Sequence, residues 1–191
     1  MKTAIVCGTG DVAHAIARAL RDHGHDVVTV SAGEDVAQAL ADVLARDGRV
    51  DALVNAPPGE ASAGTILATP EDVWDYVVAR DLTAIFRACK AVVPHFIAAG
   101  GGAIVNVATS ACYGRAKHCA ESAGHGAVVA FGAALAYDHF NDHVRVNTIV
   151  TGDAAMPDAI APVAAFLLSP AAEVMSGSLI DVGNFAYQGG H

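Results

Sequence analysis

Short apolar runs alternate with longer helical patterns along almost the whole chain. Between the apolar runs, hydrophobic residues recur every three to four positions, as expected for helices that bury one side. This alternation is typical of a parallel sheet with helices on both faces. The predicted strands cover residues 4–7, 27–30, 50–55, 104–107, 144–150 and 178–182, and the predicted helices cover residues 14–23, 34–46, 71–98, 120–140 and 157–168. We therefore predict a single α/β domain over residues 1–191, a Rossmann-like doubly wound parallel sheet of about six strands.

Prolines and chain length refine three of the predicted helices. Thr69 precedes Pro70, so we expect Thr69 to cap the third helix and Pro70 to occupy its first turn. The stretch 71–98 is long for one straight helix, which predicts two helices or a bend. Pro162 predicts that residues 157–168 divide into two short pieces.

Composition narrows the class of protein. Hydrophobic residues make up 53% of the 191 positions and charged residues only 16%, which excludes a disordered chain. The formal net charge of −9 argues against nucleic acid or an anionic membrane as a partner. No apolar run reaches the roughly 20 residues that span a bilayer, and the N-terminus shows no cleavable signal. The four cysteines have no disulfide or metal spacing, so we expect reduced thiols and a cytoplasmic protein.

A glycine-rich turn joins the first predicted strand to the first helix. Residues 8–13 read Gly-Thr-Gly-Asp-Val-Ala, the pattern G-x-G-x-x-A. In this context the glycines allow a tight turn and the approach of a pyrophosphate, which the helix N-terminus favours. Gly8, Gly10, Ala13 and, after the third strand, Asn55 are our candidate cofactor-binding residues. Asp11 places a carboxylate where the phosphate would lie, so a turn that only packs helix on sheet is the alternative.

The second predicted strand ends without an acidic residue that could hold a ribose. Val30 is followed by Ser31, whereas Glu34 and Asp35 come later and are expected in the first turn of the next helix. No arginine is placed there for a 2′-phosphate. We therefore predict no ribose anchor at this strand.

Several segments resemble the short-chain dehydrogenase/reductase family over nearly the whole chain. They are Gly8-Thr9-Gly10 and residues 48–56, 81–86, 102–106, 144–147 and 165–169. The resemblance implies a Rossmann fold, NAD(P) as cofactor and dimerisation through the long helices 71–98 and 120–140. It also calls for one more strand–helix element between residues 30 and 51 and for a substrate lid after residue 152. Both are missing here, because residues 153–157 leave almost no room for a lid.

Family enzymes use an Asn-Ser-Tyr-Lys tetrad, in which the tyrosine moves a proton and the lysine lowers its pKa. Spacing from the flanking motifs places these four positions at Asp81, Thr109, Glu121 and His125, and all four differ from the family. A glutamate with an ordinary pKa of about 4.3 is ionised at neutral pH and cannot donate a proton. His125 carries no permanent charge. We interpret Glu121 and His125 as a solvated or interface ion pair, with acid–base work at another centre as the alternative.

A second set of residues has the spacing Tyr-x-x-x-K. Tyr113 and Lys117, with Ser110 as a hydroxyl beside Thr109, form an alternative catalytic set. Gly114 disfavours a helix there, and the set would break the match to residues 144–147. The spacing of the nearby cysteines and histidines fits no standard zinc site, so no metal is predicted.

These losses favour a catalytically silent dehydrogenase-like subunit that pairs with an active homologue of the family through helices 71–98 and 120–140. Inactive subunits of heteromeric acyl-CoA-pathway dehydrogenases suggest a hydroxyacyl-CoA pathway as one setting. We expect no bound cofactor, or NAD(P) if there is one. The alternatives are an NAD(P)-dependent short-chain oxidoreductase with an atypical active site and a nucleotide-sensing module built on residues 8–13.

Overall fold

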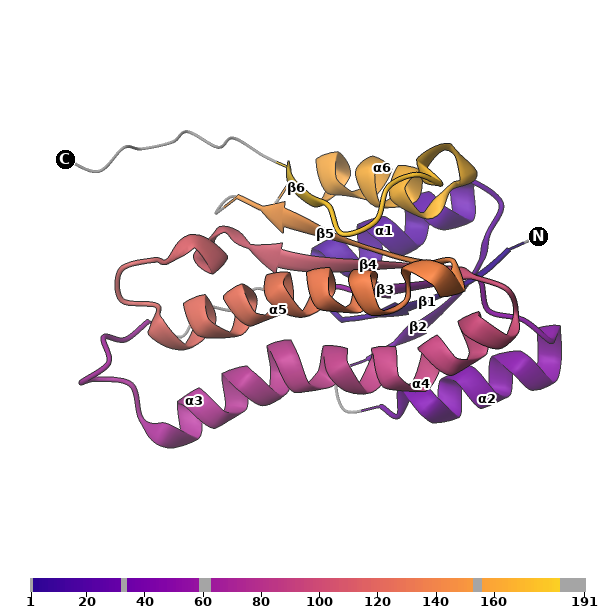
Figure 1. Ribbon diagram of the computed structural model, residues 1–191. Coiled ribbons are helices and arrows are strands. Elements are labelled where there is room, and N and C mark those ends of the chain that lie inside the picture. Colours follow the sequence, from indigo (N-terminus) through magenta and orange to yellow (C-terminus); the bar gives the residue numbers. More distant parts are fainter. Residues whose placement is uncertain (1, 32–33, 59–62, 153–155, 183–191) are drawn as a thin grey trace.

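The computed structural model describes residues 2–31, 34–58, 63–152 and 156–182, and within them the chain forms one six-stranded sheet. All strand pairs are parallel, in the order β2-β1-β3-β4-β5-β6 (Figure 1). The strands are β1 Thr3–Cys7, β2 Asp26–Val30, β3 Ala52–Asn55, β4 Gly102–Thr109, β5 Val144–Thr151 and β6 Leu179–Val182. The predicted six-stranded parallel sheet is thereby confirmed.

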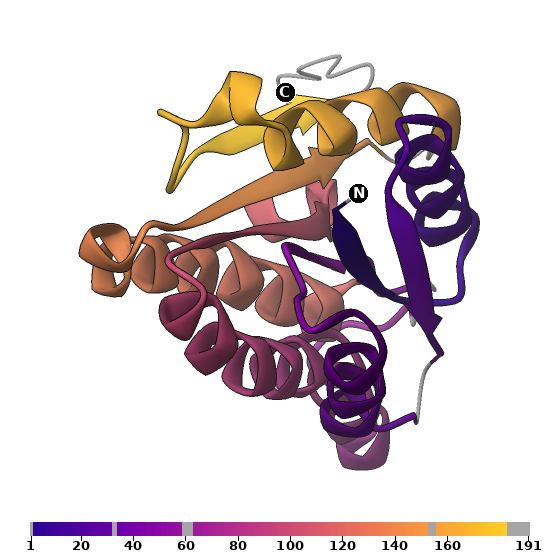
Figure 2. The same cartoon turned by 90° about the vertical axis from the view of Figure 1, so that its right-hand side faces the viewer.

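Helices cover both faces of this sheet, as Figure 2 shows end-on. The helices α1 Asp11–Asp22 and α6 Pro157–Leu168 pack together on one face. The other face carries α2 Val36–Asp47, α4 Ala84–Ala98 and α5 Cys119–Asp138, while α3 Glu71–Val78 lies at one end of the same layer. The doubly wound architecture is confirmed.

Side-chain alternation along each strand divides the apolar core into two layers. In β1, Ala4 and Val6 pack with α1 and α6, whereas Ile5 points to the layer of α2, α4 and α5. All three residues are fully buried. Successive strand side chains point to opposite faces, so a strand buried on both faces reads as a continuous apolar run.

The long helical stretch bends at a short π-helical segment, Ala79–Thr83, between α3 and α4. The prediction of two helices or a bend is confirmed. Isolated π segments interrupt the regular helix and are frequent at functional sites. Here the segment carries Asp81, whose side chain is fully buried despite its charge.

Three predicted helix details are wrong. Pro70, not Thr69, is the N-cap of α3, and the Thr69 hydroxyl donates instead to the Thr65 carbonyl at 2.9 Å. Pro162 does not divide α6, because its exposed ring lies on the solvent side of a helix whose other side is buried. Asp35 is the N-cap of α2, accepting from the Ala37 N–H at 2.9 Å, so neither Glu34 nor Asp35 lies in the first helical turn.

The sheet ends at β2 on one side. In the part of the chain that the structure describes, only α2 lies between β2 and β3, as the spacing predicts. Residues 153–155, where a lid would begin, and the tail 183–191 lie outside the described residues. Within the described ranges, none of the helices combines the length and apolar character needed to cross a membrane.

Candidate functional site

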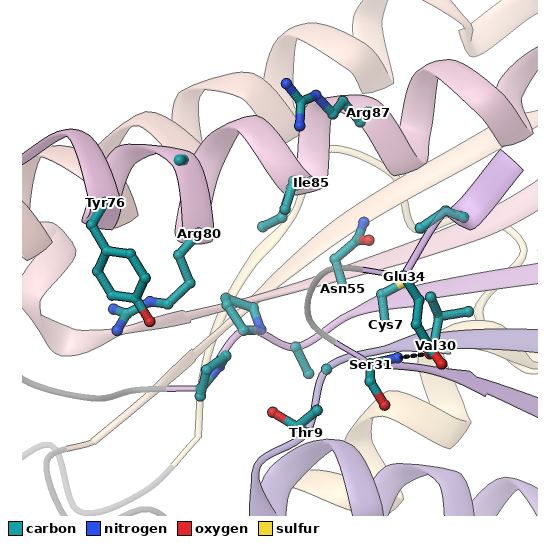
Figure 3. A pocket seen from close by; sticks show the side chains of 17 residues that line it. Cys7, Thr9, Val30, Ser31, Glu34, Asn55, Tyr76, Arg80, Ile85 and Arg87 are labelled. Carbon is teal, nitrogen blue, oxygen red and sulfur yellow. Dashed lines mark hydrogen bonds between the residues drawn. The ribbon is translucent and has the colours of Figure 1, made fainter.

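A cavity of about 450 Å³ lies where β1, β2 and β3 end, against the layer of α3 and α4 (Figure 3). Its lining falls into three groups: the glycine-rich turn, the loop after β2, and one side of the helices. The polar side chains of this lining include Thr9, Ser31, Glu34, Tyr76, Arg80 and Arg87. Carboxyl ends of parallel strands are the usual ligand position in open α/β sheets, so this cavity is the candidate binding site.

The glycine-rich turn has the geometry that a nucleotide requires. Gly8 has φ +143° and a side chain there would collide with the Ala56 carbonyl oxygen, so only glycine fits. Gly10 is the N-cap of α1 and has no side-chain cap, which leaves the helix N-terminus open. Ala13 is buried and packs α1 against the turn. Of the predicted cofactor-binding residues, Gly8 and Asn55 line the cavity, whereas Gly10 and Ala13 lie outside its lining.

An acidic residue reaches the cavity although the sequence predicted no ribose anchor. The Ser31 backbone N–H donates to the Glu34 carboxylate at 2.5 Å, and both residues line the cavity, as the dashed line in Figure 3 shows. The predicted position of Glu34 inside α2 is wrong, because the loop holds its carboxylate beside the end of β2. A carboxylate at that place is suited to accept hydrogen bonds from ribose hydroxyls.

Aromatic and cationic side chains form the helical wall of the cavity. The Arg80 guanidinium lies over the Tyr76 ring, 5.4 Å from its centroid. Arg87 lines the same cavity two helical turns further along. Sequence reasoning missed this wall, since nothing in the helical periodicity distinguishes a wall arginine from a solvated one.

Three of the four tetrad positions come together in the interior. His125 Nε2 lies 3.6 Å from Asp81 Oδ2, and the Thr109 N–H donates to His125 Nδ1 at 3.3 Å. Arg80 donates two hydrogen bonds to Asp81 from the other side, from Nε to Oδ1 at 2.6 Å and from Nη2 to Oδ2 at 2.7 Å. His125 and Asp81 are 1% and 0% exposed.

His125 is held in its neutral form. Burial lowers its pKa most strongly, and Arg80 lowers it further, against the opposing charges of Asp81 and Glu121. Because Nδ1 accepts from the Thr109 N–H, the single ring proton belongs on Nε2, which faces Asp81. A permanent cation is therefore missing from this position.

Glu121 has a partner of its own. Its Oε2 lies 3.1 Å from His118 Nδ1, one turn back along α5, and the carboxylate side chain is buried. The predicted partner, His125, lies in contact with Asp81 instead. The solvated-pair interpretation of Glu121 and His125 is wrong, because both side chains are withdrawn from solvent.

The alternative residues lie on the surface beside β4 and α5. Tyr113 belongs to the 3-10 segment Ser110–Tyr113, and its hydroxyl donates to Asp181 on β6 at 2.9 Å. Burial, then the bond to Asp181, raises the pKa of Tyr113 to about 12. Lys117 is exposed in the turn before α5, with φ +64°. The pKa of Tyr113 is thus raised, whereas a neighbouring lysine would lower the pKa of a catalytic tyrosine.

Cysteine chemistry adds nothing to the site. All four cysteines are free thiols. Burial raises the pKa of Cys7 and of Cys89 to about 12. Among the described residues, no group of three or more histidine, cysteine or acidic side chains could hold a metal ion.

The nucleotide half of NAD(P) fits this chain better than the nicotinamide half. The Gly8 turn and Glu34 suit a pyrophosphate and a ribose, although Asp11 in the first turn of α1 opposes a phosphate at the helix N-terminus itself. At the tetrad positions, by contrast, the side chains of Asp81 and His125 are sealed from solvent.

Comparison with known proteins agrees with this architecture. The family model described as short chain dehydrogenase matches residues 2–160. The chain therefore belongs to the short-chain dehydrogenase family. A short chain dehydrogenase from Mycobacterium smegmatis has the same fold, with a TM-score of 0.83 at 23% identity over 96% of this chain and 92% of that one.

Curated relatives of this chain include dehydrogenases and 3-oxoacyl-[acyl-carrier-protein] reductases. D-threitol dehydrogenase of Mycolicibacterium smegmatis is 36% identical over 74% of this chain and 65% of its own length. Meso-2,3-butanediol dehydrogenase of Serratia marcescens is 30% identical over 81% of this chain and 71% of its own length. The chain spans 48% of 2-(R)-hydroxypropyl-CoM dehydrogenase of Xanthobacter autotrophicus at 33% identity.

Proposed function

We propose that this chain is a catalytically silent short-chain dehydrogenase-type subunit that supports an active homologue. The observation that carries the proposal is the state of His125 at the lysine position. It is buried, neutral and hydrogen-bonded to the Thr109 backbone, so it can neither hold a nicotinamide ribose nor lower the pKa of a neighbouring acid.

The remaining tetrad positions support the same conclusion. Asp81 is engaged by Arg80 through two hydrogen bonds, and Glu121 is engaged by His118. Neither carboxylate is held where it could reach the oxygen of a substrate, since each is already bound by a neighbouring side chain. Hydride transfer to a carbonyl needs a proton donor at the substrate oxygen, and these positions provide none.

The partner surface of this proposal comprises the exposed sides of residues 71–98 and 120–140. Phe86 on α4 packs edge-on against Phe131 on α5, with ring centroids 6.4 Å apart, and Phe86 remains 45% exposed. Tyr137 is 85% exposed on α5. Aromatic anchors among small residues suit a helix–helix interface. We propose an active homologue as the partner, for example a dehydrogenase of a hydroxyacyl-CoA pathway, in the cytoplasm.

Co-expression with a tagged homologue encoded nearby tests the pairing. We expect the two chains to co-purify, and Phe86→Glu to reduce recovery at least about tenfold by placing a charge in the interface. Phe166→Glu, on α6 of the opposite face and equally exposed at 45%, is the matched control and should leave recovery unchanged. Absence of co-purification, or equal loss in both variants, contradicts the proposal.

An active oxidoreductase with an atypical site is the second candidate, because the relatives of this chain include D-threitol dehydrogenase and meso-2,3-butanediol dehydrogenase. It would use NAD(P) in the cavity and Tyr113 with Lys117 and Ser110 or Thr109. Assays of the isolated chain with NAD and D-threitol or 2,3-butanediol distinguish the two. Turnover that Tyr113→Phe abolishes would establish this candidate and exclude the silent subunit.

A further inference from the structure

The strand β2 forms one edge of the sheet. It pairs with β1 on its inner side, and on its outer side no strand of the described residues pairs with it (Figure 2). The next strand along the chain, β3, pairs with β1 on the far side of that strand. Because the N–H and C=O groups of an edge strand can pair with another strand, the outer edge of β2 is a candidate interaction surface.

Three residues of this edge turn their backbone groups away from β1. The Asp26 N–H donates to the chain just before β1 at 2.9 Å, and the Val30 carbonyl accepts from the turn just after β1 at 3.0 Å. Backbone groups of successive strand residues alternate between the two sides of a strand. Val27, Thr29 and Ser31 therefore present their N–H and C=O groups on the outer edge.

Two side chains of opposite charge bind this outer edge at separate places. Arg21 Nη2 donates to the Val27 carbonyl at 3.1 Å, and the Ser31 N–H donates to the Glu34 carboxylate at 2.5 Å. Val27 and Ser31 are four residues apart, which is about 13 Å along a strand. Between them, the outward N–H and C=O of Thr29 have no protein partner among the described residues.

We propose that β2 pairs antiparallel with β2 of a second copy of this chain, with Thr29 opposite Thr29 of that copy. In an antiparallel hydrogen-bonded pair the two opposed residues exchange both N–H···O bonds, so the two threonines meet on a twofold axis. In this register Val27 lies opposite Ser31 of the second copy, and its carbonyl accepts the N–H of that serine. The two sheets then form one continuous sheet.

Charge complementarity favours a second copy as the partner. Pairing releases Arg21 and Glu34 from the edge, because backbone groups of the other strand take over both of their hydrogen bonds. Both side chains are exposed and can turn aside. The register places Arg21 of each copy beside Glu34 of the other, and the twofold axis makes two such pairs of opposite charge. Within one copy, the same two side chains bind the edge too far apart to neutralise each other.

Sedimentation equilibrium of the isolated chain tests the dimer. A single strand edge is a small interface, so we expect a weak dimer that forms between about 10 μM and 1 mM. Thr29→Pro should abolish it, because proline removes an N–H that points away from β1 and is tolerated on an edge strand. Circular dichroism checks that this variant keeps its fold. A native chain that stays monomeric over this range overturns the proposal.

Charge reversal tests the register. We expect Arg21→Glu alone and Glu34→Arg alone to weaken the dimer at least about tenfold, since each places like charges together twice. The double variant should recover native affinity to within about threefold. Arg18→Glu is the matched control, because it makes the same change of charge on α1 at an arginine that pairs with Asp158. No recovery in the double variant, or equal weakening by Arg18→Glu, overturns the proposal.

Phe86→Glu separates this dimer from the pairing proposed above. Phe86 belongs to α4 in the helical layer and not to the edge strand, so its substitution should leave the β2 dimer unchanged. Self-association that Phe86→Glu abolishes and Thr29→Pro preserves would assign the contact to helices 71–98 and 120–140 and overturn the β2 dimer. Failed co-purification with a homologue would instead contradict only the pairing proposed above.

Discussion

His125 Nε2 and Asp81 Oδ2 lie 3.6 Å apart in the protein interior, on different helical segments and both out of reach of solvent. The two residues occupy the positions at which the family resemblance implies lysine and asparagine. An acid and a histidine of this kind could form a charged pair, but Arg80 already neutralises Asp81 and burial disfavours the imidazolium. Asp81 is therefore bound by Arg80, whereas His125 Nε2 faces the Asp81 carboxylate without forming a hydrogen bond.

The neutral state of His125 predicts acid sensitivity of the fold. Its folded pKa lies below the ordinary value of 6.5, so below that pH the unfolded chain binds more protons than the native one. The contribution to stability is therefore present above about pH 6.5 and is lost as the pH falls below it, by up to about 1.4 kcal/mol per pH unit. We expect urea unfolding between about pH 7.5 and pH 5.5 to show a larger loss for the native chain than for His125→Gln. Equal losses would contradict the buried neutral imidazole.

The raised pKa of Tyr113 predicts that this side chain stays protonated over the pH range in which an enzyme of this family would use its tyrosine. Burial and the bond to Asp181 raise its pKa to about 12. At about pH 10, the ordinary tyrosine value, Tyr113→Phe should therefore show almost the same phenolate absorbance as the native chain. Asp181→Asn removes the accepting carboxylate and should lower the pKa of Tyr113. A phenolate signal at neutral pH that Tyr113→Phe removes would instead favour the active oxidoreductase.

Alanine substitutions at two glycines of α5 should have opposite effects on stability. A side chain at Gly132 would lie 2.7 Å from Thr148 Oγ1, so Gly132→Ala forces the helix away from the sheet. We expect a loss of about 1–3 kcal/mol in urea unfolding. Gly126 has ordinary space, with the Cys112 carbonyl at 3.5 Å. Gly126→Ala should therefore gain up to about 1 kcal/mol from helix propensity, and a similar loss in both variants would contradict this packing.

Substitution of Arg145 should have a large effect on stability, although among the described residues Arg145 has no acidic partner in hydrogen-bond contact. Its Nη1 donates to the Leu167 carbonyl in the last turn of α6 at 2.8 Å and to the Ala172 carbonyl beyond that helix at 2.9 Å. Arg145→Met leaves these carbonyls without their donor, and we expect a loss of about 2–3 kcal/mol in chemical unfolding. Arg18→Met removes only the exposed pair with Asp158 and should change stability by less than about 1 kcal/mol. Comparable effects would show that Arg145 is not a structural donor.

The order of the secondary structure elements was predictable from the sequence, because it depends on local patterns. Each strand is a short apolar run and each helix has its own periodicity, so six strands, the glycine-rich turn and an interruption within residues 71–98 could all be found. Element ends were less predictable. Thr69 does not cap α3 because its hydroxyl is bound to the Thr65 carbonyl, and Pro162 does not interrupt α6 because its ring lies on the exposed side of that helix.

By itself, the sequence determined the fold class, since the order of short apolar runs and helical periods along the chain fixes it. Only the tertiary structure decided which side chains meet. It joined Asp81 to His125 rather than Glu121 to His125, and it brought Glu34 and Arg80 to opposite sides of one cavity. The physical reason is that periodicity reports which side of an element is buried. Contacts between elements depend instead on how sheet, helices and loops pack in three dimensions.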